Sequence, residues 1–303
     1  MLDDVLEGLS GHPKTLPSRL LYDARGSDLF EDITVLPEYY PTRTERAILT
    51  EAAPALSEAI GPGAVLVEYG AGASVKTRIL LDAMRDLAGY VPIDVSEDML
   101  AKTKPALERD YPGLPVHPVV GNFLVPPPVP DINPRARRVG FFPGSTIGNL
   151  ADEEIATFLA GAAEELGDDG LLILGVDLKK SPDILVPAYD DAQGVTAAFN
   201  LNLLARLNRE LGADFDLDRF RHEARWNEAE SRMEMHLVSL AEQTVTIGER
   251  RFDFAEGETI HTENSRKFDL DALDSLLAAS PWQRARTFLD GKGLFSVLLL
   301  ERR

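Results

Sequence analysis

The feature that most constrains the fold is a regular alternation of short apolar runs with helical segments between residues 44 and 176. Apolar runs typical of buried strands lie at 64–69, 91–95, 116–123, 138–142 and 171–176. Helical segments lie between or before them, at 44–60, 75–87 and 151–166. Strands and helices in this order form βαβ units, and the near-continuous apolar strands indicate a parallel sheet covered on both faces. We therefore expect a doubly wound α/β fold.

The remainder of the chain predicts two late strands and an insertion. Strands at 284–289 and 294–301 follow a helix near 270–278, and two such strands closing a five-stranded core look like the class I methyltransferase sheet, a Rossmann-like fold. Residues 182–212 look helical, whereas 220–240 and 244–254 alternate as strands do. We expect this α+β insertion between the fifth and sixth core strands to join the N-terminus in a second domain. The predicted domains are 44–180 plus 268–303, and 1–43 plus 181–267.

A glycine-rich turn follows the first predicted strand. Glycines let a chain turn tightly from strand to helix and let its backbone approach a ligand. The dinucleotide pattern G-x-G-x-x-G requires a third glycine where this chain has Val75. The sequence instead has the form E-x-G-x-G, at Glu68, Gly70 and Gly72, which resembles the methyltransferase loop that holds the amino-acid end of S-adenosylmethionine. A glycine turn without a ligand is the alternative interpretation.

Polar residues also end the next two predicted strands. Asp94 can accept hydrogen bonds from both hydroxyls of a ribose, or it can cap the following helix. Asn122 and Phe123 can hydrogen-bond the edge of an adenine and cover its face. Open parallel sheets bind ligands at the carboxyl ends of their strands, so the three features together predict a nucleoside site.

Charge excludes several classes of partner. Lys and Arg total 31 against 50 Asp and Glu, a net charge of -19. Such a surface repels phosphate backbones and anionic lipids, so we expect no nucleic-acid or membrane partner. The N-terminus lacks the apolar core of a signal peptide, and no apolar run approaches the roughly 18 residues that span a bilayer. We expect a cytoplasmic monomer.

The chain has no cysteine, which excludes disulfides and thiolate chemistry. The five histidines, at 12, 117, 222, 236 and 261, show no pairing at familiar metal-ligand spacing and form no H-E-x-x-H motif. We therefore expect no metal.

Four longer segments carry a resemblance to a family. They are 36–45 (LPEYYPTRTE), 144–150 (GSTIGNL), 188–200 (AYDD followed by GVTAAFN) and 226–235 (WN leading to MEM). With them the chain is similar, from about Pro13 to its last strand, to the histidine Nα-methyltransferases of ergothioneine biosynthesis. The resemblance implies an enzyme that uses S-adenosylmethionine to trimethylate the α-amino group of free L-histidine, giving hercynine.

The resemblance also implies roles for individual residues. The positions that match cofactor contacts in the family are Gly70, Lys76, Asp94, Asn122 and Phe123. Lys76 matches a residue that reaches the cofactor carboxylate. At Asn122 the family often has Asp, and an amide oxygen can still accept from the adenine amine.

The positions that match substrate contacts are Tyr22, Phe30, Tyr39, Asn149, Tyr189, Met235, Glu263, Asn264 and Ser265. The resemblance implies that Asn149 and Tyr189 hold the α-carboxylate and amine, while Tyr39, Glu263 and Ser265 hold the imidazole. Tyr22 and Phe30 match aromatic residues near the amine, and Met235 matches a lining residue. Tyr39 and Asn149 are the candidate catalytic residues.

Three alternatives remain at this point. A nicotinamide-dependent oxidoreductase has a similar sheet, but the missing third glycine disfavours it. A non-catalytic nucleoside-binding protein would not require the substrate positions. A methyltransferase for another aromatic amino acid, such as tryptophan or tyrosine, is the main competitor because only the ring pocket would differ.

Overall fold

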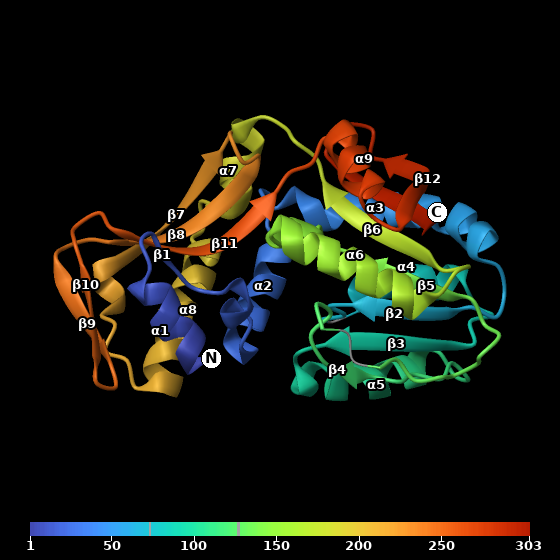
Figure 1. Cartoon of the computed structure of the whole chain (residues 1–303), viewed down its shortest axis with the longest axis horizontal. Coiled ribbons are helices and arrows are strands. Elements are labelled where there is room, and N and C mark those ends of the chain that lie inside the picture. Colours follow the sequence, from blue (N-terminus) through green and yellow to red (C-terminus); the bar gives the residue numbers. More distant parts are fainter. Residues whose placement is uncertain (73, 126–127) are drawn as a thin grey trace. The chain divides into compact units, whose positions relative to one another are not determined.

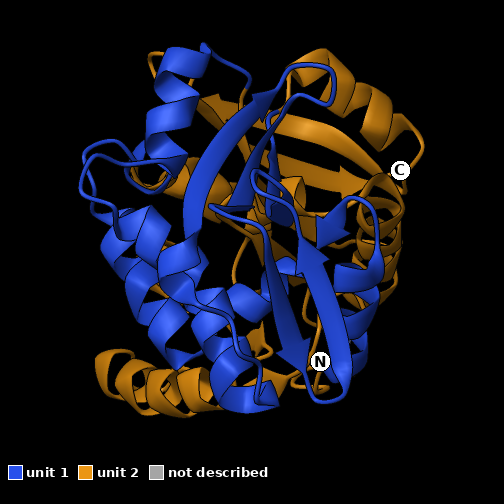
Figure 2. Cartoon of the chain, turned by 90° about the vertical axis from the view of Figure 1, so that its left-hand side faces the viewer, with its two compact units in different colours: residues 1–43, 179–267 blue, residues 44–178, 268–303 orange. Residues whose placement is uncertain are grey.

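The computed structural model describes residues 1–72, 74–125 and 128–303. The chain divides into two compact units (Figure 2). Unit 1 comprises residues 1–43 and 179–267, and unit 2 comprises 44–178 and 268–303. The sequence placed the second boundary two residues later, at 180/181.

Unit 2 is built on a seven-stranded sheet (Figure 1). Its strands are β2 (Val65–Tyr69), β3 (Gly89–Asp94), β4 (Val119–Val120), β5 (Arg138–Phe142), β6 (Leu171–Asp177), β12 (Trp282–Leu289) and β13 (Phe295–Arg302). Its helices are α3 (Tyr40–Ile60, which begins in unit 1), α4 (Val75–Ala83), α5 (Glu97–Asp110), α6 (Asp152–Leu166) and α9 (Leu270–Ala278), with a 3₁₀ turn η2 (Thr146–Asn149).

The strand order of this sheet is β12-β13-β6-β5-β2-β3-β4. Strands β4, β3, β2, β5 and β6 run parallel, and β13 pairs antiparallel with β6 and with β12. Five parallel strands closed by an antiparallel pair form the predicted class I methyltransferase sheet. The chain reverses its direction across the sheet between β2 and β5, which is where open α/β sheets bind ligands.

Both faces of the sheet are covered, because alternate strand residues enter different cores. Val67 packs in one core with Phe158 of α6 and Leu273 of α9. Its neighbour Leu66 packs in the other, with residues of α3, α4 and α5 such as Leu49. The uninterrupted apolar strands of the sequence follow from this double coverage.

The third core strand is much shorter than the predicted run 116–123. Only Val119 and Val120 form strand β4, with an isolated bridge from Val116 to Tyr90. Pro115 and Pro118 interrupt the segment, and proline cannot donate to a sheet ladder. Asn122 and Phe123 therefore follow β4 in a turn rather than ending a long strand.

Unit 1 contains a four-stranded sheet of order β1-β11-β8-β7 and a separate hairpin of β9 and β10. The strands are β1 (Lys14–Thr15), β7 (Phe220–Asn227), β8 (Arg232–Ser239), β9 (Gln243–Ile247), β10 (Arg250–Phe254) and β11 (Thr259–Arg266). The helices are α1 (Leu2–Ser10), α2 (Ala24–Thr34), α7 (Pro182–Tyr189) and α8 (Val195–Leu211), with 3₁₀ turns η1 (Ser18–Leu21) and η3 (Leu217–Arg219).

A β-bulge in β11 determines which residues share a face of this sheet. His261 pairs with His236 of β8, whereas Glu263 pairs with Met235. Consecutive residues of β8 point to opposite faces, so the bulge at Thr262 sends His261 and Glu263 to opposite faces. In a regular strand these two residues would lie on the same face.

Among the described residues, no helix is both long enough and apolar enough to cross a membrane.

Candidate active site

The glycine turn between β2 and α4 adopts backbone conformations that favour glycine. Gly70 and Gly72 have φ angles of 73° and 49°. The Gly70 amide donates to the Ile93 carbonyl oxygen at 2.9 Å, and the Gly72 amide donates to Asp94 Oδ2 at 3.0 Å. The turn is therefore tied to the end of the neighbouring strand β3. Ala73, within the predicted turn, lies outside the described residues.

Asp94 is held in a fixed orientation at the end of β3. Its Oδ2 accepts from Gly72, and its Oδ1 accepts from the Ser96 amide at 2.9 Å. The carboxylate is only partly buried, and each oxygen has a second lone pair. Its predicted alternative role as a helix cap belongs to Ser96, whose hydroxyl accepts from the Met99 amide. Asp94 can thus accept two further hydrogen bonds, as the hydroxyls of a ribose require.

Phe123 lies against the glycine turn. A Cβ placed on Gly70 would be 4.0 Å from the Phe123 ring, and that ring packs edge-on against Phe142 with centroids 5.1 Å apart. Asn122 accepts the Leu124 amide through its Oδ1 at 3.0 Å, which fixes the orientation of its side-chain amide. The structure therefore gathers Gly70, Asp94 and Phe123 at the carboxyl ends of adjacent strands. An amino-acid end, a ribose and a flat base could bind there in sequence.

Lys76, at the start of α4, forms an ion pair with a buried carboxylate that the sequence did not reveal. Its Nζ lies 2.5 Å from Glu45 Oε2. Glu45 is fully buried, and both of its oxygens also accept the Gly144 amide, at 2.9 and 3.0 Å. A Cβ on Gly175 of β6 would come within 2.1 Å of Glu45 Oε1, so only glycine leaves room for this carboxylate. Glu45 thus fixes both Lys76 and the loop that begins at Gly144.

Asn149 is the last residue of turn η2 in that loop. Ser145, just before the turn, has a φ of 57°, and its Oγ accepts the Asp177 amide at 2.9 Å. This bond ties the loop to the carboxyl end of β6. Asn149 is therefore carried at the edge of the sheet that also carries Gly70 and Asp94.

The predicted substrate residues of unit 1 form an aromatic cluster. The Tyr22 and Phe30 rings are 5.5 Å apart, Phe30 and Tyr39 are 6.3 Å apart, and Tyr39 and Tyr189 are 6.2 Å apart. Phe199 of α8 joins the cluster 5.4 Å from Tyr22. Phe199 lies within one of the distinctive segments, although no role is predicted for it from the sequence.

Local contacts explain the placement of the tyrosines. Asp23 caps α2 by accepting the Gly26 amide at 2.7 Å, and it also accepts from Asn202 of α8 at 2.8 Å. Tyr22 is thereby held between the two helices. Asp191 accepts the amides of Val195 and Thr196 at the start of α8, which fixes the turn that follows Tyr189.

Glu263 and Ser265 lie on the face of β11 that also carries Met235 of the neighbouring strand. Glu263 is buried, and Tyr22 donates to its Oε1 at 3.4 Å. Burial raises the pKa of Glu263 to about 7, and the nearby Lys267 ammonium and the Tyr22 hydroxyl offset part of that effect. Such a carboxylate changes its charge close to neutral pH.

Lys267 is a site residue that the sequence analysis missed. Its buried ammonium donates to the Tyr189 hydroxyl at 2.7 Å and to Ser265 Oγ at 2.8 Å, and Tyr189 and Ser265 lie 2.7 Å apart. The available signal was its position two residues after Ser265 in an extended segment, which favours the same face. Lys267 places a positive charge beside Tyr189.

Asn264 is not placed with the other predicted substrate residues. It pairs with Glu234 of β8, so its side chain lies on the opposite face from Glu263 and Ser265. The structure thus separates Asn264 from Met235, which is buried opposite Glu263.

A buried hydrogen-bond chain supports the ring-binding face. His222 Nε2 lies 2.8 Å from the Tyr189 carbonyl oxygen, and its Nδ1 lies 2.9 Å from Asn200 Nδ2. Asn200 Oδ1 in turn accepts the Thr262 hydroxyl at 2.7 Å. Burial lowers the pKa of His222, which agrees with a neutral ring that donates through Nε2 and accepts through Nδ1. The chain connects Tyr189 to the bulge beside Glu263.

The sheet order, the glycine turn and the oriented Asp94 define a class I methyltransferase that uses S-adenosylmethionine. A family model described as histidine-specific, S-adenosylmethionine-dependent methyltransferase matches residues 1–302. The chain belongs to this family.

The chain is also similar to individual relatives and to solved structures. A protein of Mycolicibacterium smegmatis named histidine N-alpha-methyltransferase is 45% identical, covering 99% of this chain and 94% of its own length. One of the same name from Mycobacterium tuberculosis is 45% identical over 98% of this chain and 93% of its own. A 4-dimethylallyltryptophan N-methyltransferase of Aspergillus fumigatus is 28% identical over 78% and 74%. Among solved structures, a methyltransferase of Clostridium acetobutylicum has a TM-score of 0.47 at 12% identity, covering 94% of each chain.

Proposed function

We propose that this enzyme trimethylates the α-amino group of L-histidine to give hercynine, as a step of ergothioneine biosynthesis. The observation that carries the proposal is the buried carboxylate of Glu263 on the same face as Ser265. The two mycobacterial relatives that bear the name histidine N-alpha-methyltransferase support the position of the methylated nitrogen.

The ring-binding face suits an imidazole better than a phenol or an indole. A neutral imidazole has one N–H donor and one nitrogen acceptor. Glu263 can accept the N–H, and a hydroxyl at Ser265 or Tyr39 can serve the other nitrogen. An indole or a phenyl ring would leave the buried carboxylate without one of its partners, and sites built for hydrogen bonding reject such ligands strongly.

The remaining residues suit the other two groups of an amino acid. We assign the α-carboxylate and amine to Asn149 and Tyr189, with the Lys267 ammonium beside the Tyr189 hydroxyl as a further source of positive charge. The trimethylated product is a quaternary ammonium, and the aromatic faces of Tyr22, Phe30 and Tyr39 can stabilise its charge.

Chemically, the protein has to position and desolvate its reactants. When bound, S-adenosylmethionine supplies an electrophilic methyl group, and the attacking amine must be neutral with its lone pair directed at that carbon. An α-amino group titrates near about pH 8, so activity should rise with pH through that range. The residues that we assign to the cofactor are Gly70, Lys76, Asp94, Asn122 and Phe123.

A second candidate is N-methylation of another aromatic amino acid, such as tryptophan or tyrosine. One relative of this chain is named for the N-methylation of a tryptophan derivative, 4-dimethylallyltryptophan. The two candidates share every cofactor residue and differ in the ring pocket alone.

One experiment separates them. The purified enzyme is incubated with S-adenosylmethionine and an equimolar mixture of the twenty amino acids, and products are measured by mass. We expect histidine to gain three methyl groups while tryptophan and tyrosine remain unmodified. Methylation of tryptophan or tyrosine at a comparable rate, or accumulation of monomethylhistidine as the end product, would contradict the proposal.

A further inference from the structure

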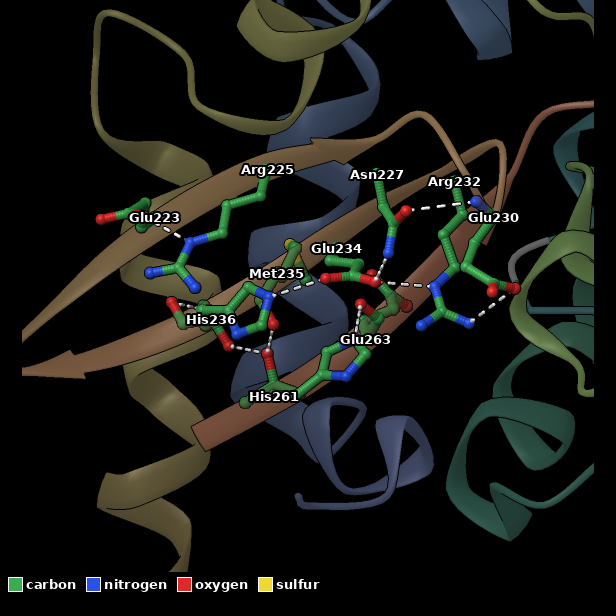
Figure 3. Close-up of polar contacts among 12 residues, drawn as sticks. Glu223, Arg225, Asn227, Glu230, Arg232, Glu234, Met235, His236, His261 and Glu263 are labelled. Atoms are coloured by element: carbon green, nitrogen blue, oxygen red, sulfur yellow. Dashed lines mark hydrogen bonds and ion pairs between the residues drawn. The ribbon is translucent and has the colours of Figure 1, made fainter. Parts of the chain in front are cut away.

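The face of the four-stranded sheet opposite Glu263 carries a separate polar cluster (Figure 3). Its centre consists of Glu234 and His236 on β8 and His261 on β11. Arg225 and Asn227 of β7 lie on the same face, because each pairs directly with a residue of β8 that points there. None of these residues is among those that we assign to methyl transfer.

The three central side chains converge. His236 Nε2 lies 3.1 Å from Glu234 Oε2, and the His236 and His261 rings are stacked with centroids 4.7 Å apart and planes 19° apart. One potential ligand atom from each of the three residues lies within 4.8 Å of the other two. Ligand atoms around one tetrahedral Zn²⁺ are about 3.4 Å apart. To bind the ion, the three side chains must therefore move closer together, and the hydrogen bond between His236 and Glu234 must open.

One buried acceptor in this cluster has no hydrogen-bond partner among the described residues. A carboxylate can only accept, so His236 donates through Nε2–H to Glu234, and its Nδ1 carries a lone pair. That Nδ1 is buried and unpartnered. His236 itself is 6% exposed. A buried acceptor without a donor is unfavourable, and a cation would satisfy it.

Outer contacts orient these groups. Glu234 Oε1 accepts from Asn227 Nδ2 at 2.9 Å and from Arg232 Nε at 2.8 Å. His261 Nε2 donates to the Glu263 backbone oxygen at 3.1 Å, which leaves the lone pair on its Nδ1. Histidine ligands of metals commonly donate their other nitrogen to a carbonyl or a carboxylate in this way.

We propose that Glu234, His236 and His261 form a binding site for one divalent transition-metal cation of the Zn²⁺ type. Two imidazoles and one carboxylate favour Zn²⁺, Co²⁺, Ni²⁺ or Cu²⁺ over Mg²⁺ and Ca²⁺, which prefer oxygen ligands. Water or Asn264 Oδ1 can complete the coordination. Spacings along the chain predict no metal site, because only strand pairing brings His261 to residues more than twenty positions away.

The positive charges near the cluster oppose the site but do not cancel it. Arg225 is paired with Glu223, and Arg232 with Glu234 and Glu230. Arg221 also pairs with Glu223, so these three arginines are balanced by Glu223, Glu230 and Glu234, and the local charge is close to neutral. The bound metal would join β8 to β11 directly beside the bulge that positions Glu263.

The test measures metal binding without cofactor or amino acid, because free histidine is itself a chelator. Tag-free protein is stripped with EDTA, dialysed and titrated with Zn²⁺ by calorimetry, and Co²⁺ is then added to record its visible absorption. We expect one Zn²⁺ per chain with a dissociation constant of about 10 µM or lower. A Zn²⁺ concentration of 100 times the dissociation constant should raise the unfolding temperature by about 5 °C.

Matched variants identify the ligands. His236→Ala and His261→Ala should each weaken Zn²⁺ binding at least 30-fold, and Glu234→Gln, which keeps the shape of the side chain, at least 5-fold. His12→Ala and His117→Ala remove histidines elsewhere and should leave binding unchanged. Circular dichroism checks that each variant folds. If an alanine variant does not fold, the Zn²⁺ affinity of Glu234→Gln decides the test. The proposal is wrong if the intact protein binds no Zn²⁺ below about 1 mM, or if folded variants bind as tightly as the parent. Either result leaves the methyltransferase proposal untouched, since neither measurement involves methyl transfer.

Discussion

Replacing Glu263 with glutamine should make the ligand-free protein more stable while making it a poorer enzyme for histidine. Glu263 is buried, and burial raises its pKa from 4.5 to about 7. The folded protein therefore holds a proton that the unfolded chain has lost between these pH values. Stability consequently falls as pH rises through this window, and at pH 8 the ionised carboxylate is at its most unfavourable.

The size of both effects follows from that shift. A difference of about 2.5 pKa units corresponds to about 3 kcal/mol, which is an upper limit for the gain in stability at pH 8 when a neutral amide replaces the carboxylate. The same change weakens a charged hydrogen bond to the substrate ring from about 1.5–3 kcal/mol to about 0.5–1.5 kcal/mol. We expect kcat/KM for histidine to fall about 10-fold at pH 8.

The assay compares Glu263→Gln with Glu256→Gln, which changes an exposed carboxylate in the same unit. Thermal unfolding at pH 5 and pH 8 should show a gain in unfolding temperature for Glu263→Gln at pH 8 only. In the parent enzyme kcat/KM should rise with pH through about 7 as Glu263 ionises, and Glu263→Gln should lack that component. The reasoning is wrong if Glu263→Gln is no more stable than the parent at pH 8 and retains full activity on histidine. In that case the buried charge of Glu263 does not destabilise the protein, and Glu263 does not contact the imidazole ring of the substrate.

Three further substitutions test the rest of the site. Asp94→Ala should weaken binding of S-adenosylhomocysteine about 10- to 100-fold in calorimetry, because the ribose loses a charged acceptor; unchanged affinity in a folded variant would remove Asp94 from the site. Asn149→Ala should lower both histidine affinity and kcat while largely preserving cofactor affinity, and equal loss of both ligands would mark it as structural. Glu45→Gln leaves the Lys76 ammonium without its buried counter-charge and should lower the free energy of unfolding by about 3 kcal/mol, measured by denaturant unfolding against the exposed Glu51→Gln on the same helix.

The core of unit 2 was predictable because its signals are local. Apolar runs of strand length separated by helix-length segments specify parallel strands, and chain order then limits the topology. The exception is β4, where Pro115 and Pro118 remove donors inside an apolar run. The pattern of apolar residues there describes what is buried rather than which residues pair.

The predicted cofactor residues are close in space for the same reason, since each follows a strand of one sheet. Contacts between distant segments were not predictable in this way. The Lys76–Glu45 pair joins α4 to α3, and the room for its carboxylate depends on Gly175 of β6. In the sequence Lys267 looks like an ordinary charged residue. In the structure it follows strand β11 directly and lies beside Tyr189 and Ser265. These contacts depend on tertiary geometry that no local pattern encodes.

The bulge at Thr262 shows how a single extra residue produces the geometry of the ring-binding face. In a regular strand Thr262 and Glu263 would point to opposite faces, whereas in a bulge both oppose a single partner residue, here Met235. Thr262 can then donate to Asn200 and so join the buried chain through His222 to Tyr189, while Glu263 lies on that same face beside Tyr22. Thr262 fixes the position of this part of the strand, and its neighbour Glu263 supplies the negative charge. Residue alternation alone would have assigned Glu263 to the face of His261, so the division of this sheet into two chemically different faces depends on the bulge.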